Sequence, residues 1–87
     1  MTEIKYYKTY DINEATFLCV KGFELSSIEN SGKRKTFVFD YSDQLYEMVR
    51  IFYFGKPEDP DLMVNAQEIL QTFRTLKSKL YSNIATN

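Results

Sequence analysis

The sequence has no histidine and a single cysteine among its 87 residues. Without histidine, the chain lacks the commonest general base, the commonest nitrogen ligand for metals and the usual partner of a catalytic nucleophile. Cys19 cannot form an internal disulfide, which fits a reducing compartment, and it falls on the apolar side of a predicted helix, where thiols are normally inert. No glycine-rich phosphate-binding loop is present. We therefore predict no enzymatic activity, no cofactor and no metal site.

Long apolar runs and an excess of basic residues are also missing. No segment has the length and apolarity of a membrane span, and the first residues, MTEIKYYKTY, lack the charged and apolar regions of a signal peptide. We therefore expect a cytoplasmic location. The net charge of −1 argues against a broad nucleic-acid-binding surface, because such surfaces carry an excess of lysine and arginine.

Aromatic residues are abundant, with seven phenylalanines and seven tyrosines. A chain of this length has a small core, which has no room for all fourteen rings. Tyrosine combines an apolar ring with a polar tip and is therefore suited to interfaces. The composition thus predicts that some of the tyrosines lie at the surface.

The pattern of apolar and turn-forming residues predicts one α+β domain that spans residues 1–87. Asp11 with Glu14, and Asn65 with Glu68, have the spacing of a capping box at a helix start. The order β-α-β-β-α-α favours a small three-stranded, mainly antiparallel sheet with the helices packed on one face. The expected elements are strands at 3–10, 23–27 and 36–41, a turn at 29–33, helices at 12–21, 43–54 and 66–81, and a frayed tail at about 82–87.

The stretch GKRKTFVFDYSDQL places Phe37, Phe39 and Tyr41 at alternate positions after three cations. Such a strand can expose its rings as a platform for nucleic-acid bases, or it can bury them beneath helices. It lacks the glycine and the spacing of the RNA-recognition signature. The predicted partners across the hairpin, Phe23 and Leu25, are also apolar. We therefore predict that the rings belong to the core.

The helix expected at 43–54 carries more aromatic residues than one buried stripe uses. The residues at helical spacing that form its inward stripe are Leu45, Met48, Val49 and Phe52. The remaining rings lie beside many carboxylates, a combination that suits a protein interface with a basic partner. The predicted protein-binding residues are Tyr46, Tyr53, Phe54, Glu58, Asp59 and Asp61.

Two groups of cations support an alternative function. If both groups lay side by side, they would form a patch that binds the phosphates of DNA or RNA. If they lay apart, one group would be solvated beside a turn and the other would complement a helix C-terminus. The residues of this alternative nucleic-acid site are Lys33, Arg34, Lys35, Arg74 and Lys77. A further alternative is a structural homodimer formed over an exposed aromatic patch.

Three segments, KTYDINEATFLCVKGFEL, GKRKTFVFDYSDQL and VNAQEILQTFRTLKSKLY, resemble a family of short domains of unknown function from phages, prophages and mobile elements of low-GC Gram-positive bacteria. The shared features are a threonine–aspartate start before a short helix, a G-F-x-L strand, a K-x-F-x-F strand and an R-x-L-K-S core in the last helix. The resemblance runs from about Lys8 to Tyr81. At Tyr10 the sequence has tyrosine before the aspartate, where the family pattern has threonine.

This resemblance implies no catalytic residues. It implies a small phage or mobile-element protein that acts by stoichiometric binding in the host bacterial cytoplasm. Occlusion of a host nuclease or defence effector is one such role, by analogy with anti-restriction and anti-CRISPR inhibitors, and assistance to phage DNA or RNA metabolism is another.

Overall fold

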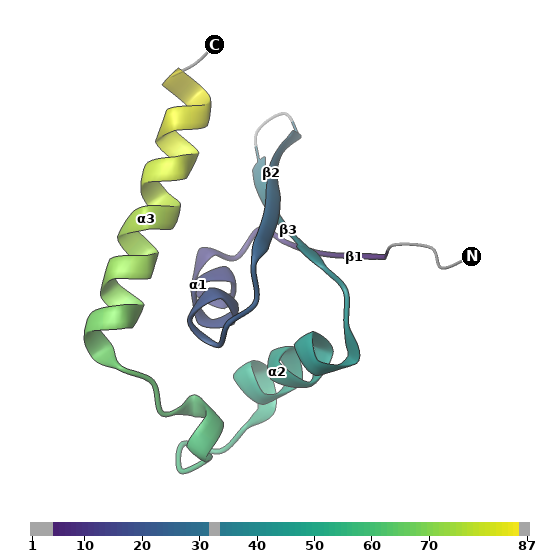
Figure 1. The fold of residues 1–87 in the computed structure, drawn as a ribbon, viewed down its shortest axis with the longest axis vertical. Coiled ribbons are helices and arrows are strands. Elements are labelled where there is room, and N and C mark those ends of the chain that lie inside the picture. Colours follow the sequence, from purple (N-terminus) through teal and green to yellow (C-terminus); the bar gives the residue numbers. More distant parts are fainter. Residues whose placement is uncertain (1–4, 32–33, 86–87) are drawn as a thin grey trace.

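The structure, a computed structural model, describes residues 5–31 and 34–85 and has the predicted order of elements (Figure 1). The strands pair in the order β1-β3-β2, and both pairings are antiparallel. This confirms the α+β class and the three-stranded antiparallel sheet. The elements are β1 (Tyr6–Thr9), α1 (Ile12–Val20), β2 (Leu25–Ser31), β3 (Arg34–Asp40), α2 (Asp43–Phe54), the 3-10 helix η1 (Pro60–Leu62) and α3 (Ala66–Ala85).

The central strand β3 directs its phenylalanines into the core. Phe37 and Phe39 are only 1% and 0% exposed, and they lie opposite Thr9 and Tyr7 of β1. They share one apolar cluster with residues of all three helices. The prediction that these rings belong to the core is therefore confirmed, and they offer no platform for bases. Tyr41 differs from the prediction, because it follows the end of β3 and is exposed.

The opposite face of the sheet is mostly polar, although Val38 of β3 lies on it and is only 2% exposed. Lys8 Nζ lies 3.2 Å from Glu29 Oε1, which joins the outer strands across β3. The Ser26 hydroxyl donates to Asp40 Oδ1 over 2.8 Å. Polar groups on this side and rings on the other are the pattern of an antiparallel sheet that is covered on one face.

A bulge explains why β2 differs from its predicted range. Leu25 pairs with Phe39, but the next paired residue is Ser27 rather than Ser26. The extra residue reverses the alternation, so that Ile28 lies opposite Phe37 on the inner side. The strand therefore continues to Ser31, through part of the predicted turn at 29–33, of which residues 32–33 lie outside the described ranges.

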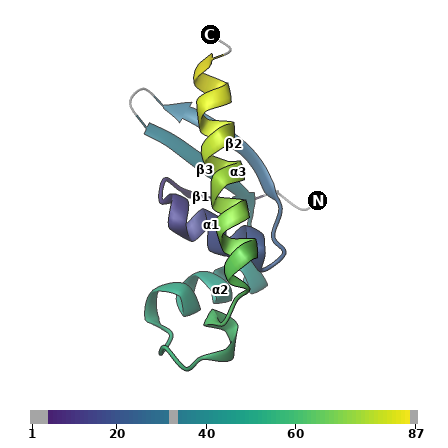
Figure 2. The same ribbon diagram turned by 90° about the vertical axis from the view of Figure 1, so that its left-hand side faces the viewer.

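Helix α1 occupies the middle of the molecule. Figure 1 shows it between the sheet, α2 and α3, and Figure 2 shows α3 crossing over it. It is accordingly buried around much of its circumference, and even polar residues of its first turns have little exposure. Its buried residues are Glu14, Ala15, Thr16, Phe17 and Leu18.

Side chains cap the two longer helices, at Ser42 for α2 and at the predicted cap Asn65 for α3. Ser42 Oγ accepts from the Leu45 amide over 3.0 Å, and Asn65 Oδ1 accepts from the Glu68 amide over 3.0 Å. Helix α3 continues to Ala85, beyond the predicted end at residue 81.

The inward stripes of these helices hold with one exception. Leu45, Val49 and Leu76 are buried. In the last helix, the spacing of Ile69, Leu70, Phe73, Leu76 and Leu80 predicts that all five face inward, but Leu70 is exposed. Helix α3 therefore contacts the rest of the domain along a narrower stripe than the spacing predicts.

The domain is thin, with extents of 43 × 39 × 19 Å. Its radius of gyration is 13.6 Å, against roughly 12 Å for a compact chain of this length. A thin domain has few positions that are covered on all sides. This shape accounts for the large number of exposed rings.

Candidate functional site

Three predicted site residues form what we call the aromatic face of α2: Tyr46, Tyr53 and Phe54. Tyr53 follows Tyr46 by two helical turns, which places both on the same side of the helix, and Phe54 ends the helix beside them. Their side chains are 49%, 50% and 82% exposed, respectively. Arg50 lies between the tyrosines, with its guanidinium 3.8 Å from the Glu47 carboxylate. The three rings are therefore exposed along the same helix.

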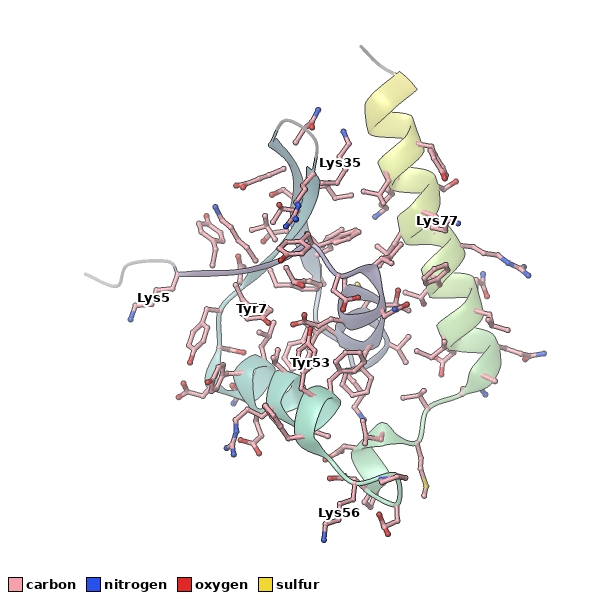
Figure 3. The ribbon with its side chains drawn as sticks, turned by 180° about the vertical axis from the view of Figure 1, so that it is seen from behind. Lys5, Tyr7, Lys35, Tyr53, Lys56 and Lys77 are labelled. Carbon is pink, nitrogen blue, oxygen red and sulfur yellow. The ribbon has the colours of Figure 1, made fainter. Side chains whose placement is uncertain are left out.

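A buried carboxylate lies directly behind this face. Glu14 of α1 is 1% exposed. Its Oε1 accepts hydrogen bonds from the Tyr53 hydroxyl over 2.6 Å and from the Thr9 hydroxyl over 2.8 Å. Its Oε2 accepts from the Tyr7 hydroxyl. Figure 3 shows Tyr7 of β1 and Tyr53 of α2 pointing toward one another. One carboxylate thus ties β1, α1 and α2 together.

The surroundings of Glu14 keep its two tyrosine donors protonated. Burial raises the pKa of both Tyr7 and Tyr53 above the ordinary value of 10.0, and the hydrogen bond to Glu14 and its negative charge raise it further. Tyr46 adds to the effect at Tyr7, and Tyr10 adds to it at Tyr53. The Tyr7 and Tyr53 phenol groups therefore meet at one carboxylate, which has little access to solvent and holds Tyr53 in place through a hydrogen bond.

The sequence predicted a different partner for Glu14. Asp11 does cap α1, and its Oδ1 accepts from the Asn13 amide over 2.8 Å. Glu14 does not complete the capping box, because the Asp11 amide donates to Thr9 Oγ1 instead, over 3.1 Å. One signal for the true arrangement was available: Glu14 precedes Leu18 by one turn and therefore shares its inward side.

The three predicted acids of the connector differ in their environments. Glu58 is exposed. Asp59 caps η1, with its Oδ1 accepting from the Asp61 amide over 2.9 Å. The Asp61 carboxylate lies 3.6 Å from Lys21 Nζ at the end of α1. Two of the three acids therefore also hold the connector in shape, and Glu58 is the one most open to a partner.

The cations of the alternative site divide between two places. Arg34 and Lys35 line a shallow groove with Leu80 of α3, and the Arg34 guanidinium lies 4.4 Å from the centre of the Tyr10 ring. Arg74 lines a separate depression on α3, and the Lys77 ammonium lies 5.7 Å from the centre of the Phe73 ring. Figure 3 shows Lys35 on the hairpin and Lys77 on α3. Lys33 lies outside the described residues.

In the described part of the chain, no three carboxylates or cysteines gather as ligands for a metal ion. Burial raises the pKa of the Cys19 thiol, which lowers the fraction of reactive thiolate at neutral pH. Between residues 5 and 85, leaving aside the hairpin tip, no helix is long and apolar enough to cross a membrane.

These features define a small α+β domain with an open aromatic face that is held from behind by a buried carboxylate. The chain belongs to the family described as Domain of unknown function (DUF5659), which matches residues 4–82. No curated protein and no solved structure matches the chain. The family description assigns no activity.

Proposed function

We propose that this domain is a non-catalytic binding module that covers a surface of another protein with the aromatic face of α2. The observation that carries the proposal is the exposure of Tyr46, Tyr53 and Phe54 on one helix. Tyrosine and arginine are enriched among the residues that dominate binding energy at interfaces, and Arg50 lies within this face. A well-ordered face also loses less conformational entropy on binding, and Glu14 supplies that order at Tyr53.

The charges around the face favour a basic partner. Asp43 and Glu47 lie on α2 itself, where Glu47 is paired with Arg50, and the exposed Glu58 lies in the connector that follows. Acids at the rim of an interface steer a basic surface into place and penalise acidic ones. Basic surfaces are typical of proteins that handle nucleic acids. We therefore propose a nuclease or another nucleic-acid-handling protein as the class of partner.

The proposed setting is the cytoplasm of a bacterial host, with the domain encoded by a phage or mobile element. This setting is supported by the family resemblance of the sequence motifs. A domain that covers the nucleic-acid channel of a host defence enzyme would inhibit it stoichiometrically, as an anti-defence protein does. The likeness to such inhibitors is one of size, acidity and tyrosine content.

Direct binding of nucleic acid is the weaker candidate. Phe37 and Phe39, the rings that would stack on bases, lie in the core. Arg34 and Arg74 line different depressions. The alternative predicts affinity for bare DNA or RNA that falls steeply with salt. If the purified domain does not shift the electrophoretic mobility of DNA or RNA at low ionic strength, the alternative of direct nucleic-acid binding is excluded.

The test is capture of a partner from a bacterial lysate, followed by matched variants. We expect the Tyr46→Ala and Phe54→Ala variants to lose the partner, because each removes an exposed ring of the proposed binding surface. Neither side chain is hydrogen-bonded to Glu14, so the contacts of that carboxylate are kept in both variants. Leu70→Ala and Tyr81→Ala are the controls, because both remove exposed apolar area from α3 instead. Equal capture by all four variants would contradict the proposal. Light scattering on the purified domain identifies a homodimer, the remaining alternative.

A further inference from the structure

A groove to which α2 contributes no residue combines apolar walls with two cations. It lies between the hairpin of β2 and β3 and the end of α3, which point in the same direction (Figure 1). Its volume is about 450 Å³, within the range of roughly 300–1,000 Å³ that is usual for ligand sites. The residues of its lining are Tyr10, Ile12, Arg34, Lys35, Phe37 and Leu80.

The apolar walls of the groove are part of the core. Phe37 of β3 is buried, and Ile12 of α1 and Leu80 of α3 pack against the same apolar cluster. Three elements therefore meet at the groove, and their packing fixes the spacing of its walls. An apolar part of a ligand that lies against these residues is removed from water, which favours binding in proportion to the area covered.

Arg34 places a cation beside these walls. Its guanidinium lies 4.4 Å from the centre of the Tyr10 ring, and a guanidinium that stacks on a ring keeps the N–H groups of its edge available as donors. None of the ion pairs between described residues includes Arg34. The edge of a guanidinium matches the two oxygens of a carboxylate. Lys35, which also lines the groove, adds a second positive charge.

The acids nearest to the groove along the chain are engaged elsewhere. Asp11 lies between Tyr10 and Ile12, but its Oδ1 accepts from the Asn13 and Glu14 amides at the start of α1. Glu29 of β2 is paired with Lys8 on the opposite face of the sheet. No acid is among the described residues of the lining. The charge of the groove therefore favours an anion.

The lining also restricts the rest of the ligand. Apart from the two cations, the Tyr10 hydroxyl is the polar side-chain group among the described residues of the lining. The amides of a peptide, or the sugar and base edges of a nucleotide, would lose hydrogen bonds to water here with few replacements. An alkyl chain has no such groups. The lining therefore favours an alkyl chain with one anionic head.

We infer that this groove binds a free alkyl carboxylate, the chemical class of the fatty acids. Its carboxylate lies at Arg34, and its chain lies along Ile12, Phe37 and Leu80. This site goes beyond the proposed function, because it shares no residue with the aromatic face of α2. Loss of one site therefore leaves the other intact.

Sodium decanoate, below the concentration at which it forms micelles, is the probe. We expect saturable NMR shift changes on titration, centred on the methyl groups of Ile12 and Leu80. Affinity should fall about two- to fourfold for each methylene removed, in the series decanoate, nonanoate and octanoate. Decyltrimethylammonium, which has the same chain and the opposite charge, should bind about tenfold more weakly or worse. Equal binding of the two decyl compounds, an affinity independent of chain length, shifts centred elsewhere, or no binding would overturn the inference.

Replacement of the cation gives matched variants. Arg34→Gln changes an exposed side chain and should weaken decanoate binding about fivefold or more. Lys8→Gln removes an exposed cation from the opposite face of the sheet and should leave the affinity unchanged. Thermal unfolding checks that both variants fold. Equal decanoate affinities of the two variants would contradict the inference.

Replacement of an apolar wall residue tests the chain of the ligand separately. Leu80→Asn puts a polar group into the groove and should weaken decanoate binding, whereas Leu70→Asn, at an exposed position of α3, should not. Decanoate binding that is equal in these two variants would overturn the placement of the chain.

Two further probes identify other occupants of the groove. Vesicles of phosphatidylglycerol present an anionic head and alkyl chains in a membrane, and a thymidine oligonucleotide tests the alternative of direct nucleic-acid binding. Binding of either probe that depends on Arg34, without binding of decanoate, would overturn the inference in favour of that occupant.

Discussion

The inner face of the sheet and the outer face of α2 both carry aromatic rings at regular spacing, yet their environments are opposite. Phe39 and Phe54 have identical side chains, but the first is fully buried and the second is the most exposed large apolar residue in the described part of the chain. Ring chemistry does not explain this difference. The number of layers does, because helices cover β3 whereas no described element covers the outer side of α2 in a domain only 19 Å thick. The comparison separates the rings that stabilise the fold from the rings that are available to a partner.

The largest expected effect comes from the buried side of this comparison. Phe39→Ala should lower the free energy of unfolding by about 3–5 kcal/mol, because it leaves a cavity in the core. Phe54→Ala should change it by no more than about 0.5 kcal/mol, since that ring lies in solvent. Urea unfolding of both variants measures the difference. Similar losses of unfolding free energy for the two variants would contradict the distinction between buried and exposed rings.

An intermediate effect is expected at the group that joins the two regions. Glu14→Gln should lower the free energy of unfolding by about 2–3 kcal/mol, because the amide cannot accept from all three hydroxyl donors as the carboxylate does. Glu58→Gln, in the exposed connector, is the matched control and should have almost no effect. Urea unfolding again gives the values. A Glu14→Gln variant as stable as the control would show that the three hydroxyls do not depend on the charge.

The smallest expected effect is a loss of stability at alkaline pH. The pKa values of Tyr7 and Tyr53 are raised above 10.0 in the folded protein, first by burial and then by Glu14. The unfolded chain therefore loses these protons first, and it binds fewer protons than the folded chain above pH 10, so stability should fall as the pH rises. Below pH 10 both tyrosines are protonated in the folded and the unfolded chain, so their contribution to the stability of the fold is fully present.

Replacement of one of the two tyrosines isolates their part in this pH dependence. Tyr53→Phe should flatten the decline, because it removes one shifted group from both the folded and the unfolded states. Tyr81→Phe removes an exposed hydroxyl that is not bonded to Glu14 and should leave the slope unchanged. Thermal unfolding between pH 8 and pH 11 compares the slopes. Identical slopes for wild type and Tyr53→Phe would contradict the account.

Much of the fold was available from the sequence because it depends on local chemistry. Ser42 and Asn65 cap their helices through amides only three residues away. The alternation around Phe37 and Phe39 marks the buried face of β3 without any knowledge of its partners. The exposure of Phe54 followed from the limited width of one inward stripe on α2.

The rest of the site depends on contacts that no local pattern records. Tyr53 reaches Glu14 from a different element, 39 positions along the chain. Whether Glu14 completes a capping box or turns inward is decided by that distant hydroxyl and by Tyr7. The bulge between Leu25 and Ser27 depends on the register with β3. The pairing of Asp61 with Lys21 similarly depends on how the connector folds back onto α1.

We propose that the aromatic face of α2 is the binding surface. The most direct test of this proposal compares the affinities of two double variants for the captured partner by calorimetry. Tyr46→Ala combined with Phe54→Ala should raise Kd about thirtyfold or more, as expected for rings that dominate an interface. Tyr6→Ala combined with Tyr81→Ala removes exposed rings from β1 and α3 and should change Kd by no more than about threefold. Equal effects of the two double variants, or a greater loss with the second, would contradict the claim.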